Sequence, residues 1–241
     1  MVDIGEEEPV QIVCGGSNLY VGEHVVVSKP GAEVVWHGQG EPVKITKTKM
    51  RGESSYGMIC ASTEVYLSDF FPNEGEEEIV DLKGFDCKPG DSVADLFGMN
   101  DTVLEIDNKS LSNRPDLWGH YGIARELSAI YDVPLKELPR YELPKVPEYS
   151  VEIKDTTKCN RYVAVEIDGI YEKTSPMWMQ SLLSKVGQRP INTIVDITNY
   201  VMMAVGQPLH TFDKTHVSGE KIIVRNAKEN EKLLLLDNNF I

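Results

Sequence analysis

Residues 187–213 read GQRPINTIVDITNYVMMAVGQPLHTFD, and this stretch predicts one helix bounded by turn-forming residues. The helix is expected from about Asn192 to Val205, because Gly206 favours a helix end and Pro208 cannot continue a helix. Asn192, Asp196 and Asn199 recur at intervals of four and three residues. We therefore expect these three polar side chains on one face of the helix.

The loop that follows the predicted helix, residues 206–213, is a candidate binding site. It brings an amide, the imidazole of His210 and a carboxylate within a few residues of a rigid proline. An imidazole beside amides can orient a water or bind the hydroxyls of an ester, so hydrolysis is chemically possible. The residues alone leave an alternative open, in which His210 bonds a backbone group in a turn. Asp196 and Asp213 are more typical of residues that cap helices or tie down turns.

Outward from this stretch, the C-terminal part of the chain alternates strand and helix patterns. Strands are expected at VEIKD (151–155) and YVAVEIDGI (162–170), and later at IIVR (222–225) and KLLLLD (232–237). Between them, Ser175 and Pro176 predict the start of a further helix that ends at Gly187.

The N-terminal third predicts a small antiparallel barrel. Its β-rich runs QIVC, HVVVS, VKITKTKM and GMICAS are separated by glycine and turn residues. Gly15 and Gly16 favour a turn, because no GK[ST] motif or helix follows them.

Charge is unevenly distributed in this third. Lys44, Lys47, Lys49 and Arg51 form a basic patch, in which Lys47, Lys49 and Arg51 are expected on one face of a strand. That face suits phosphates, and a solvated strand face explains it equally well. The acidic run at 74–78 is most simply a solvated loop.

Between the two parts lie a connector and a linker. Residues 83–102 read as a connector with one short amphipathic piece, and VLEID (103–107) is strand-like. A helix with Asn113 as its cap and Pro115 in its first turn is expected to end near Asp132. Its Trp118 and His120 are expected in packing or surface roles rather than as ligands. The proline-rich stretch 134–147 predicts a linker.

Composition limits the classes of function. The chain has 241 residues, 41% of them hydrophobic, and is expected to form about two domains. It has no apolar run of the ~20 residues that span a membrane, and we expect it in the cytoplasm. The net charge of -14 argues against a protein that grips DNA or RNA backbones over its whole surface. The four cysteines are too far apart to predict a metal or redox site.

Three blocks of the chain, in order, resemble the β subunit of bacterial phenylalanyl-tRNA synthetases. RPINTIVDITNYVMMAVGQPLHTFD looks like the editing-module signature of that family. VLEIDNKSLSNRPDLWGHYGIARELSAIY is similar to the segment after its barrel, with Ser110 to Pro115 where the family usually has a Thr-Pro-Asn-Arg-like run. QIVCGGSNLYVGEHVVVSKPGAEV and KMRGESSYGMICAST look like the oligonucleotide-binding (OB) fold shared with free-standing tRNA-binding proteins.

The resemblance implies an α+β, multi-domain chain with an OB-fold barrel over 1–82, an α/β scaffold over 83–133, the linker at 134–147 and the first part of a B3/B4-type editing module over 148–241. It implies an α2β2 heterotetramer that uses ATP and Mg²⁺ to attach phenylalanine to its tRNA in the α subunit. No cofactor or metal is expected in this segment, and no membrane or DNA partner. Both ends are expected to be cut, which would leave the modules incomplete and apolar surface exposed.

For the β subunit, the resemblance implies hydrolysis of tyrosine wrongly attached to the phenylalanine tRNA. By motif position, His210 and Asn199 place the ester and a water, while Thr193, Arg189 and Gln207 contact the substrate. Lys47, Lys49 and Arg51 are weaker candidates for tRNA contact. The alternatives are a stand-alone tRNA-binding module and a scaffold without catalysis.

Overall fold

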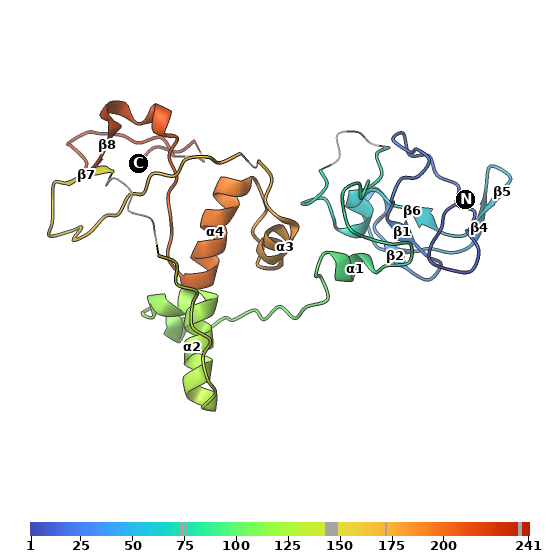
Figure 1. The fold of residues 1–241 in the computed structure, drawn as a ribbon, viewed down its shortest axis with the longest axis horizontal. Coiled ribbons are helices and arrows are strands. Elements are labelled where there is room, and N and C mark those ends of the chain that lie inside the picture. The colour runs from blue at the N-terminus through green and yellow to red at the C-terminus, as the bar shows by residue number, and fades with distance from the viewer. Residues whose placement is uncertain (73–74, 76, 143–148, 172, 236–237) are drawn as a thin grey trace. The chain divides into compact units, whose positions relative to one another are not determined.

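The computed structural model describes residues 1–72, 75, 77–142, 149–171, 173–235 and 238–241 (Figure 1). Contacts divide the chain into two units. The first contains Met1–Ile123 and Lys173–Leu209, and the second contains Ala124–Glu172 and His210–Ile241. Glu74 and Glu76 of the acidic run and residues 143–147 of the expected linker lie outside the described residues.

Short antiparallel strand pairs form the N-terminal part of the first unit (Figure 1). The pairs are β1 (Val27–Ser28) with β6 (Met58–Ile59), β2 (Glu33–Val34) with β3 (Val43–Lys44), and β4 (Thr48–Met50) with β5 (Glu53–Ser55). Among the described residues these strands pair only two by two, and the expected run 11–14 forms no strand. The strand-rich character of this part is confirmed, and no closed barrel is present within the described ranges.

A compact apolar core holds these short strands together. Its buried members come from the strands, from the loops between them and from the connector: Val26, Val34, Ile45, Cys60, Leu67, Val80, Leu82 and Phe97. Phe97 is 2% exposed, and Phe70, Phe71 and Phe85 surround its ring at centroid distances of 5.5–6.1 Å. Packed aromatic rings of this kind stabilise a core beyond their buried area. The short helices η1 (Trp36–Gly38) and η2 (Ser62–Val65) pack together beside it.

The connector contains one short helix, α1 (Val93–Leu96), whose N-cap Ser92 accepts a hydrogen bond from the Asp95 N–H. The expected strand at 103–107 is wrong. Val103, Leu104 and Ile106 are 55–77% exposed, and residues 101–108 have no strand partner in the part of the chain that the structure describes. A strand needs a neighbour that accepts its backbone hydrogen bonds, and alternating side chains alone do not supply one.

The next helix is broken rather than continuous. After η3 (Lys109–Leu111), the chain forms η4 (Pro115–Trp118) and then α2 (His120–Tyr131), separated by Gly119 in an extended conformation. Asn113 does not cap it, because Arg114 occupies the N-cap position of η4. The expected end near Asp132 is confirmed, since α2 stops one residue earlier and Asp132 has a left-handed φ of 51°.

Two helices complete the first unit: α3 (Met177–Lys185) and α4 (Thr193–Val205) (Figure 1). They pack against each other, and the rings of Trp178 and Tyr200 meet edge to face at 5.4 Å. α3 also contacts the connector, because the Ser181 hydroxyl donates to the Phe97 carbonyl at 2.6 Å. Both helices were expected from the sequence, and their positions are confirmed within one or two residues.

In the second unit, β7 (Ser150–Ile153) and β8 (Lys221–Val224) form a parallel pair in which Ser150 lies opposite Lys221 (Figure 1). Glu152 forms ion pairs with Lys154 and Lys221, which lower the pKa of its carboxyl to about 2. The short helices η5 (Lys214–His216) and η6 (Ser218–Glu220) precede β8.

Two other strand predictions for the second unit meet different outcomes. The expected strand at 162–170 is wrong, because no residue of that run pairs with a described strand, and Val163, Val165 and Ile167 are 49–70% exposed. In the run 232–237, only a single bridge forms, between Leu234 and Phe240, and residues 236–237 lie outside the described ranges. Across the described residues, no helix has both the length and the apolar character to cross a bilayer.

Candidate functional site

The α4 helix begins and ends as its sequence predicts. The Asn192 side-chain oxygen accepts hydrogen bonds from the N–H groups of Ile194 and Val195, at 3.1 and 3.0 Å. This satisfies two of the N–H groups that a helix start leaves without a backbone partner. At the other end, Gly206 adopts a φ of 76°, which is inexpensive only for glycine.

Asp196 lies in the first turn of α4 and is 1% exposed. Its carboxylate accepts hydrogen bonds from the Ser175 hydroxyl and from the Ile191 N–H, the latter at 2.8 Å. Gln180 of α3 donates its side-chain amide to the Ser175 carbonyl at 2.7 Å. Asp196 therefore fixes the loop that leads into α4 against the start of α3, as the turn-binding alternative predicts.

A cavity of about 560 Å³ opens beside these groups, at the N-terminal end of α4. It is lined by the segment before α3, by the loop before α4 and by a loop of the N-terminal part. Its lining residues are Ser68, Asp69, Phe70, Pro72, Thr174, Ser175, Gln180, Arg189, Pro190, Ile191, Asn192 and Asp196. The structure thus brings together Arg189, Asn192 and Asp196 from the sequence-predicted set.

Sequence reasoning missed the other side of this cavity. Asp69 and Phe70 lie over 100 residues away from α4 in the chain, and no motif or spacing links them to it. Ser175 and Pro176 were expected to start α3; Pro176 holds the N-cap position, whereas the Ser175 hydroxyl bonds Asp196. Only the folded chain reveals these partners, because the contacts are long-range.

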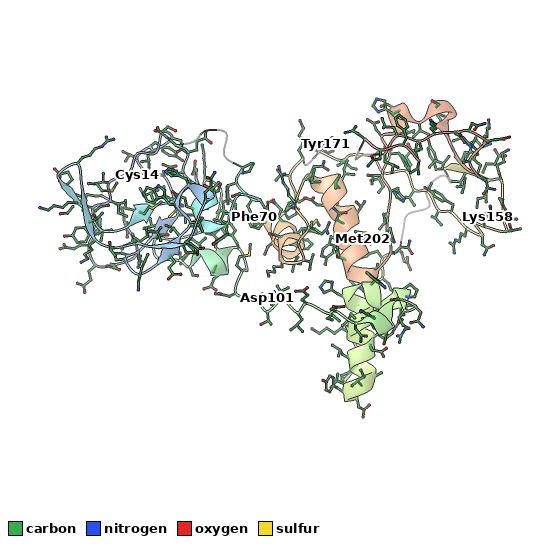
Figure 2. All side chains as sticks on the ribbon, turned by 180° about the vertical axis from the view of Figure 1, so that it is seen from behind. Cys14, Phe70, Asp101, Lys158, Tyr171 and Met202 are labelled. Carbon is green, nitrogen blue, oxygen red and sulfur yellow. The ribbon has the colours of Figure 1, made fainter. Side chains whose placement is uncertain are left out.

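Two further candidates lie on α4 itself. Asn199 is half-buried, and Thr193, the first residue of the helix, donates its N–H to the Lys173 carbonyl at 3.3 Å. The Thr193 hydroxyl oxygen is buried without a hydrogen-bond partner among the described residues. The three polar residues of the helix face thus differ. Asn192 caps the helix, Asp196 is buried and bonds the preceding loop, and Asn199 is half-buried. Figure 2 shows Met202 further along the same helix.

Residues 207–213 of the loop after α4 are exposed. Gln207 bonds the Pro208 carbonyl at 3.2 Å within the first unit, whereas His210 begins the C-terminal segment of the second unit. Asn199 and His210 therefore belong to different units. Asp213 caps η5 by accepting from the Thr215 hydroxyl and N–H, at 2.7 and 2.9 Å, and these bonds hold the pKa of Asp213 below its ordinary value.

His120 and Trp118 take the packing or surface roles expected of them. The His120 ring nitrogen Nδ1 lies 2.8 Å from the Met203 carbonyl oxygen near the end of α4, and Trp118 is 69% exposed. Within the described residues, no cluster of three or more histidine, cysteine, aspartate or glutamate side chains is arranged to hold a metal ion.

The basic patch is divided between two strand pairs: Lys44 lies on β3, whereas Lys47, Lys49 and Arg51 lie at or beside the β4–β5 hairpin. Lys47 and Lys49 are exposed and line a shallow cavity with Tyr56, and the Lys47 ammonium lies 4.7 Å from the centre of the Tyr56 ring. The sequence had predicted Arg51 in a strand with Lys47 and Lys49, but β4 ends before it, at Met50. Arg51 begins the hairpin turn with a φ of 51°, so strand alternation does not place it with the two lysines.

Two family models match the chain at its two ends. The model described as "Putative tRNA binding domain" matches residues 1–91, and the "B3/4 domain" matches residues 158–240. Phenylalanine–tRNA ligase β subunits match nearly all of it. The Staphylococcus haemolyticus subunit is 38% identical over 99% of this chain, and the Staphylococcus saprophyticus subunit 40% identical over 98%.

Over nearly its whole length, the chain is similar in sequence to phenylalanine–tRNA ligase β subunits. The Bacillus cereus β subunit is a third such relative, 38% identical over 98% of the chain. The chain spans 29% of the length of these relatives. The order of its two domain matches is the order expected from the three resembling blocks.

Proposed function

We propose that this chain serves in a phenylalanine–tRNA ligase β subunit, in an α2β2 enzyme of the cytoplasm. The observation that carries the proposal is 38–40% identity to such β subunits over 98–99% of the chain. In that enzyme the α subunit would attach phenylalanine to its tRNA with ATP and Mg²⁺. This chain would support that step without binding either cofactor.

The chemistry proposed for the chain is hydrolysis of tyrosine that has been attached to the phenylalanine tRNA. The match of residues 158–240 to the B3/4 domain supports an editing role. Asn199 and His210 would place the ester and a water, with Thr193, Arg189 and Gln207 as substrate contacts. A site that bonds the tyrosine hydroxyl can prefer tyrosine over phenylalanine strongly, because phenylalanine leaves buried polar groups unpaired.

The construction of α4 supports its use as part of such a site. Asn192 caps the helix, Asp196 ties its first turn to the preceding loop, and Gly206 ends it. Asn199 is therefore presented from a helix whose first turn is tied to the preceding loop. Side chains on rigid elements are held more precisely than side chains on loops.

We further propose that the N-terminal part is an OB-type domain that contacts tRNA locally. Its antiparallel strand pairs and its match to a tRNA-binding family model support this assignment. Lys47 and Lys49 beside Tyr56 offer positive charge and an aromatic ring, the two features with which proteins bind single-stranded nucleic acids. Arg51 would add a contact from the turn. The net charge of -14 restricts contact to such local patches.

The proposed domains are the OB-type domain at 1–82, the scaffold at 83–133, the linker at 134–147 and the editing part at 148–241. A stand-alone tRNA-binding module, the rival function, needs only the first of these. It leaves residues 158–240 and their match to the B3/4 domain without a role, so it is not favoured.

The test replaces His210 or Asn199 with alanine in the assembled α–β enzyme that contains this chain. Each change is expected to slow removal of tyrosine from charged phenylalanine tRNA by about 10²-fold, since each removes a group that positions a reactant or stabilises its charge. Loss of radiolabelled tyrosine from the tRNA measures the rate. His216→Ala is the matched control, because His216 is an exposed histidine of the same unit.

Phenylalanine attachment is measured in parallel and is expected to stay unchanged, which shows that the variants fold and assemble. If both variants remove tyrosine at the unchanged rate, the roles assigned to His210 and Asn199 are wrong.

A further inference from the structure

We propose that His24 and Cys87 together bind one divalent cation of the zinc class, with imidazole and thiolate as its ligands. The Cys87 sulfur lies 3.5 Å from the His24 ring nitrogen Nδ1. The two residues are 63 positions apart in the sequence, and both belong to the first unit. Neither is among the residues assigned to editing or to tRNA contact, so the proposal stands whether or not those roles hold.

The separation of the two atoms is the one that a tetrahedral ion requires. Zinc bonds a thiolate sulfur at about 2.3 Å and an imidazole nitrogen at about 2.0–2.1 Å. With an angle of about 109° between these two bonds, the sulfur and the nitrogen lie about 3.5–3.6 Å apart. The observed distance of 3.5 Å between Cys87 and His24 therefore already matches that of a bound ion.

Without an ion, the same distance describes a weak hydrogen bond in which the Cys87 thiol donates to Nδ1 of His24. This bond requires the histidine tautomer whose proton is on Nε2. It directs the nitrogen lone pair and the thiol proton toward each other. A cation that binds here replaces that proton: bonds form from the cation to Sγ and to Nδ1, the S–H bond breaks, and the proton leaves to water.

The two ligands are held in place by the fold of the N-terminal part. The His24 carbonyl accepts the Leu82 N–H at 2.9 Å, and the next residue, Val25, forms an antiparallel bridge with Asp81. Cys87 follows on the same connector and packs against the apolar core. Both side chains are therefore positioned before an ion arrives, which lowers the cost of binding.

The surroundings of the thiol carry negative charge. Burial raises the pKa of the Cys87 thiol, and the nearby carboxylates of Asp91 and Asp86 raise it further. These carboxylates disfavour a bare thiolate, yet they attract a cation, whose positive charge offsets the thiolate's. The net charge of -14 on the chain acts in the same direction.

The ligand types select the class of cation. Thiolate sulfur and imidazole nitrogen suit Zn²⁺ and softer ions such as Cd²⁺, whereas Mg²⁺ prefers oxygen ligands. Among the described residues, no third histidine, cysteine, aspartate or glutamate completes a metal cluster with this pair. Water is therefore expected at the remaining positions. His24 is exposed and Cys87 partly exposed, so water and the ion can reach both.

Titration of the 241-residue chain with Cd²⁺ tests the proposal, because a cadmium–thiolate bond absorbs in the ultraviolet. The thiols are kept reduced with a phosphine that does not compete for the ion. We expect one saturable site per chain, from which Zn²⁺ displaces Cd²⁺ and an excess of Mg²⁺ does not. Absence of saturable absorbance, or displacement by Mg²⁺, overturns the proposal.

Four variants locate the site. Cys87→Ser is expected to lose the saturable absorbance, and His24→Ala is expected to weaken binding at least about tenfold. Cys159→Ser and His216→Ala remove a partly exposed cysteine and an exposed histidine of the second unit, and are expected to bind as the unmodified chain does. If Cys87→Ser keeps its absorbance, the ion binds elsewhere. If His24→Ala keeps its affinity, the thiol acts alone. Either result overturns the proposal.

Nitrogen NMR of the unmodified chain tests the pair without any substitution. Zn²⁺ is expected to shift the Nδ1 resonance of His24, because the ion bonds that atom, and to leave the chain's other histidines unshifted. If the chain is saturated with Zn²⁺ and the His24 resonance stays in place, His24 is not a ligand and the proposal is overturned.

Discussion

Alanine in place of Asp196 is expected to lower the free energy of unfolding of the first unit by about 2–4 kcal/mol. The carboxylate is 1% exposed and accepts bonds from the Ser175 hydroxyl and the Ile191 N–H. Alanine leaves the buried Ser175 hydroxyl and the part-buried Ile191 N–H without their partner and opens a small cavity. Removing the carboxylate also removes the free-energy cost of burying its charge, which offsets part of this loss. Asparagine keeps the shape and one acceptor, so Asp196→Asn is expected to cost less.

Urea unfolding followed by the fluorescence of Trp178 measures this effect where it arises. Trp178 meets Tyr200 across the α3–α4 contact, and the chain's other tryptophans, Trp36 and Trp118, are replaced by phenylalanine in every sample. Asp86→Ala, an exposed aspartate, is expected to stay within about 0.5 kcal/mol. If the free energy of unfolding of Asp196→Ala is as close to that of the unmodified chain as the control's, Asp196 does not hold α4.

The second large effect is expected at Gly119, where alanine is expected to destabilise the first unit by about 2–3 kcal/mol. A Cβ at this position would lie 2.3 Å from the Gly206 nitrogen and 2.7 Å from the Val205 carbonyl carbon. Both are backbone atoms, so no side chain can rotate away. The end of α4 must then move away from η4, and the loop that begins at Gly206 moves with it.

The same unfolding measurement applies, with Gly15→Ala as its control. A Cβ added at Gly15 would have no atom within 4 Å, and Gly15 has no positive φ, so the same extra methyl meets open space. If Gly119→Ala unfolds at the same urea concentration as Gly15→Ala, the close approach of η4 and α4 is not present in solution.

The parts of the fold that the sequence predicts well are those with local causes. The bounds of α4 follow from Asn192, which bonds N–H groups two and three residues ahead, and from Gly206, whose left-handed φ few other residues adopt. Both signals act within a single turn of the helix and need no distant partner. The end of α2 lies beside Asp132, whose φ of 51° is left-handed.

The strands that were predicted wrongly lack a local cause of this kind. Residues 103–107 and 162–170 have the composition of strands, yet strand formation needs a neighbouring backbone, which side-chain alternation cannot reveal. Likewise, Gly119 interrupts the expected helix because its backbone approaches Gly206, which is 87 residues further along the chain.

The residues of the candidate site also fall into those that the sequence predicts and those that it does not. Arg189, Asn192 and Asp196 are close in sequence, so their grouping was predictable, and the structure brings them together at one cavity. Asp69 and Phe70 on its other side were not predictable, because over 100 residues separate them from α4. The relation of His210 to Asn199 stays a prediction from the resemblance.

Above all, we propose that this chain contributes to a site that removes tyrosine from phenylalanine tRNA. The decisive measurement is the rate at which the unmodified α–β enzyme hydrolyses tyrosine-charged phenylalanine tRNA, relative to the same tRNA charged with phenylalanine. We expect the tyrosine ester to be hydrolysed about 10²-fold faster or more. Equal rates for the two esters, or rates no greater than without enzyme, would contradict the proposed role.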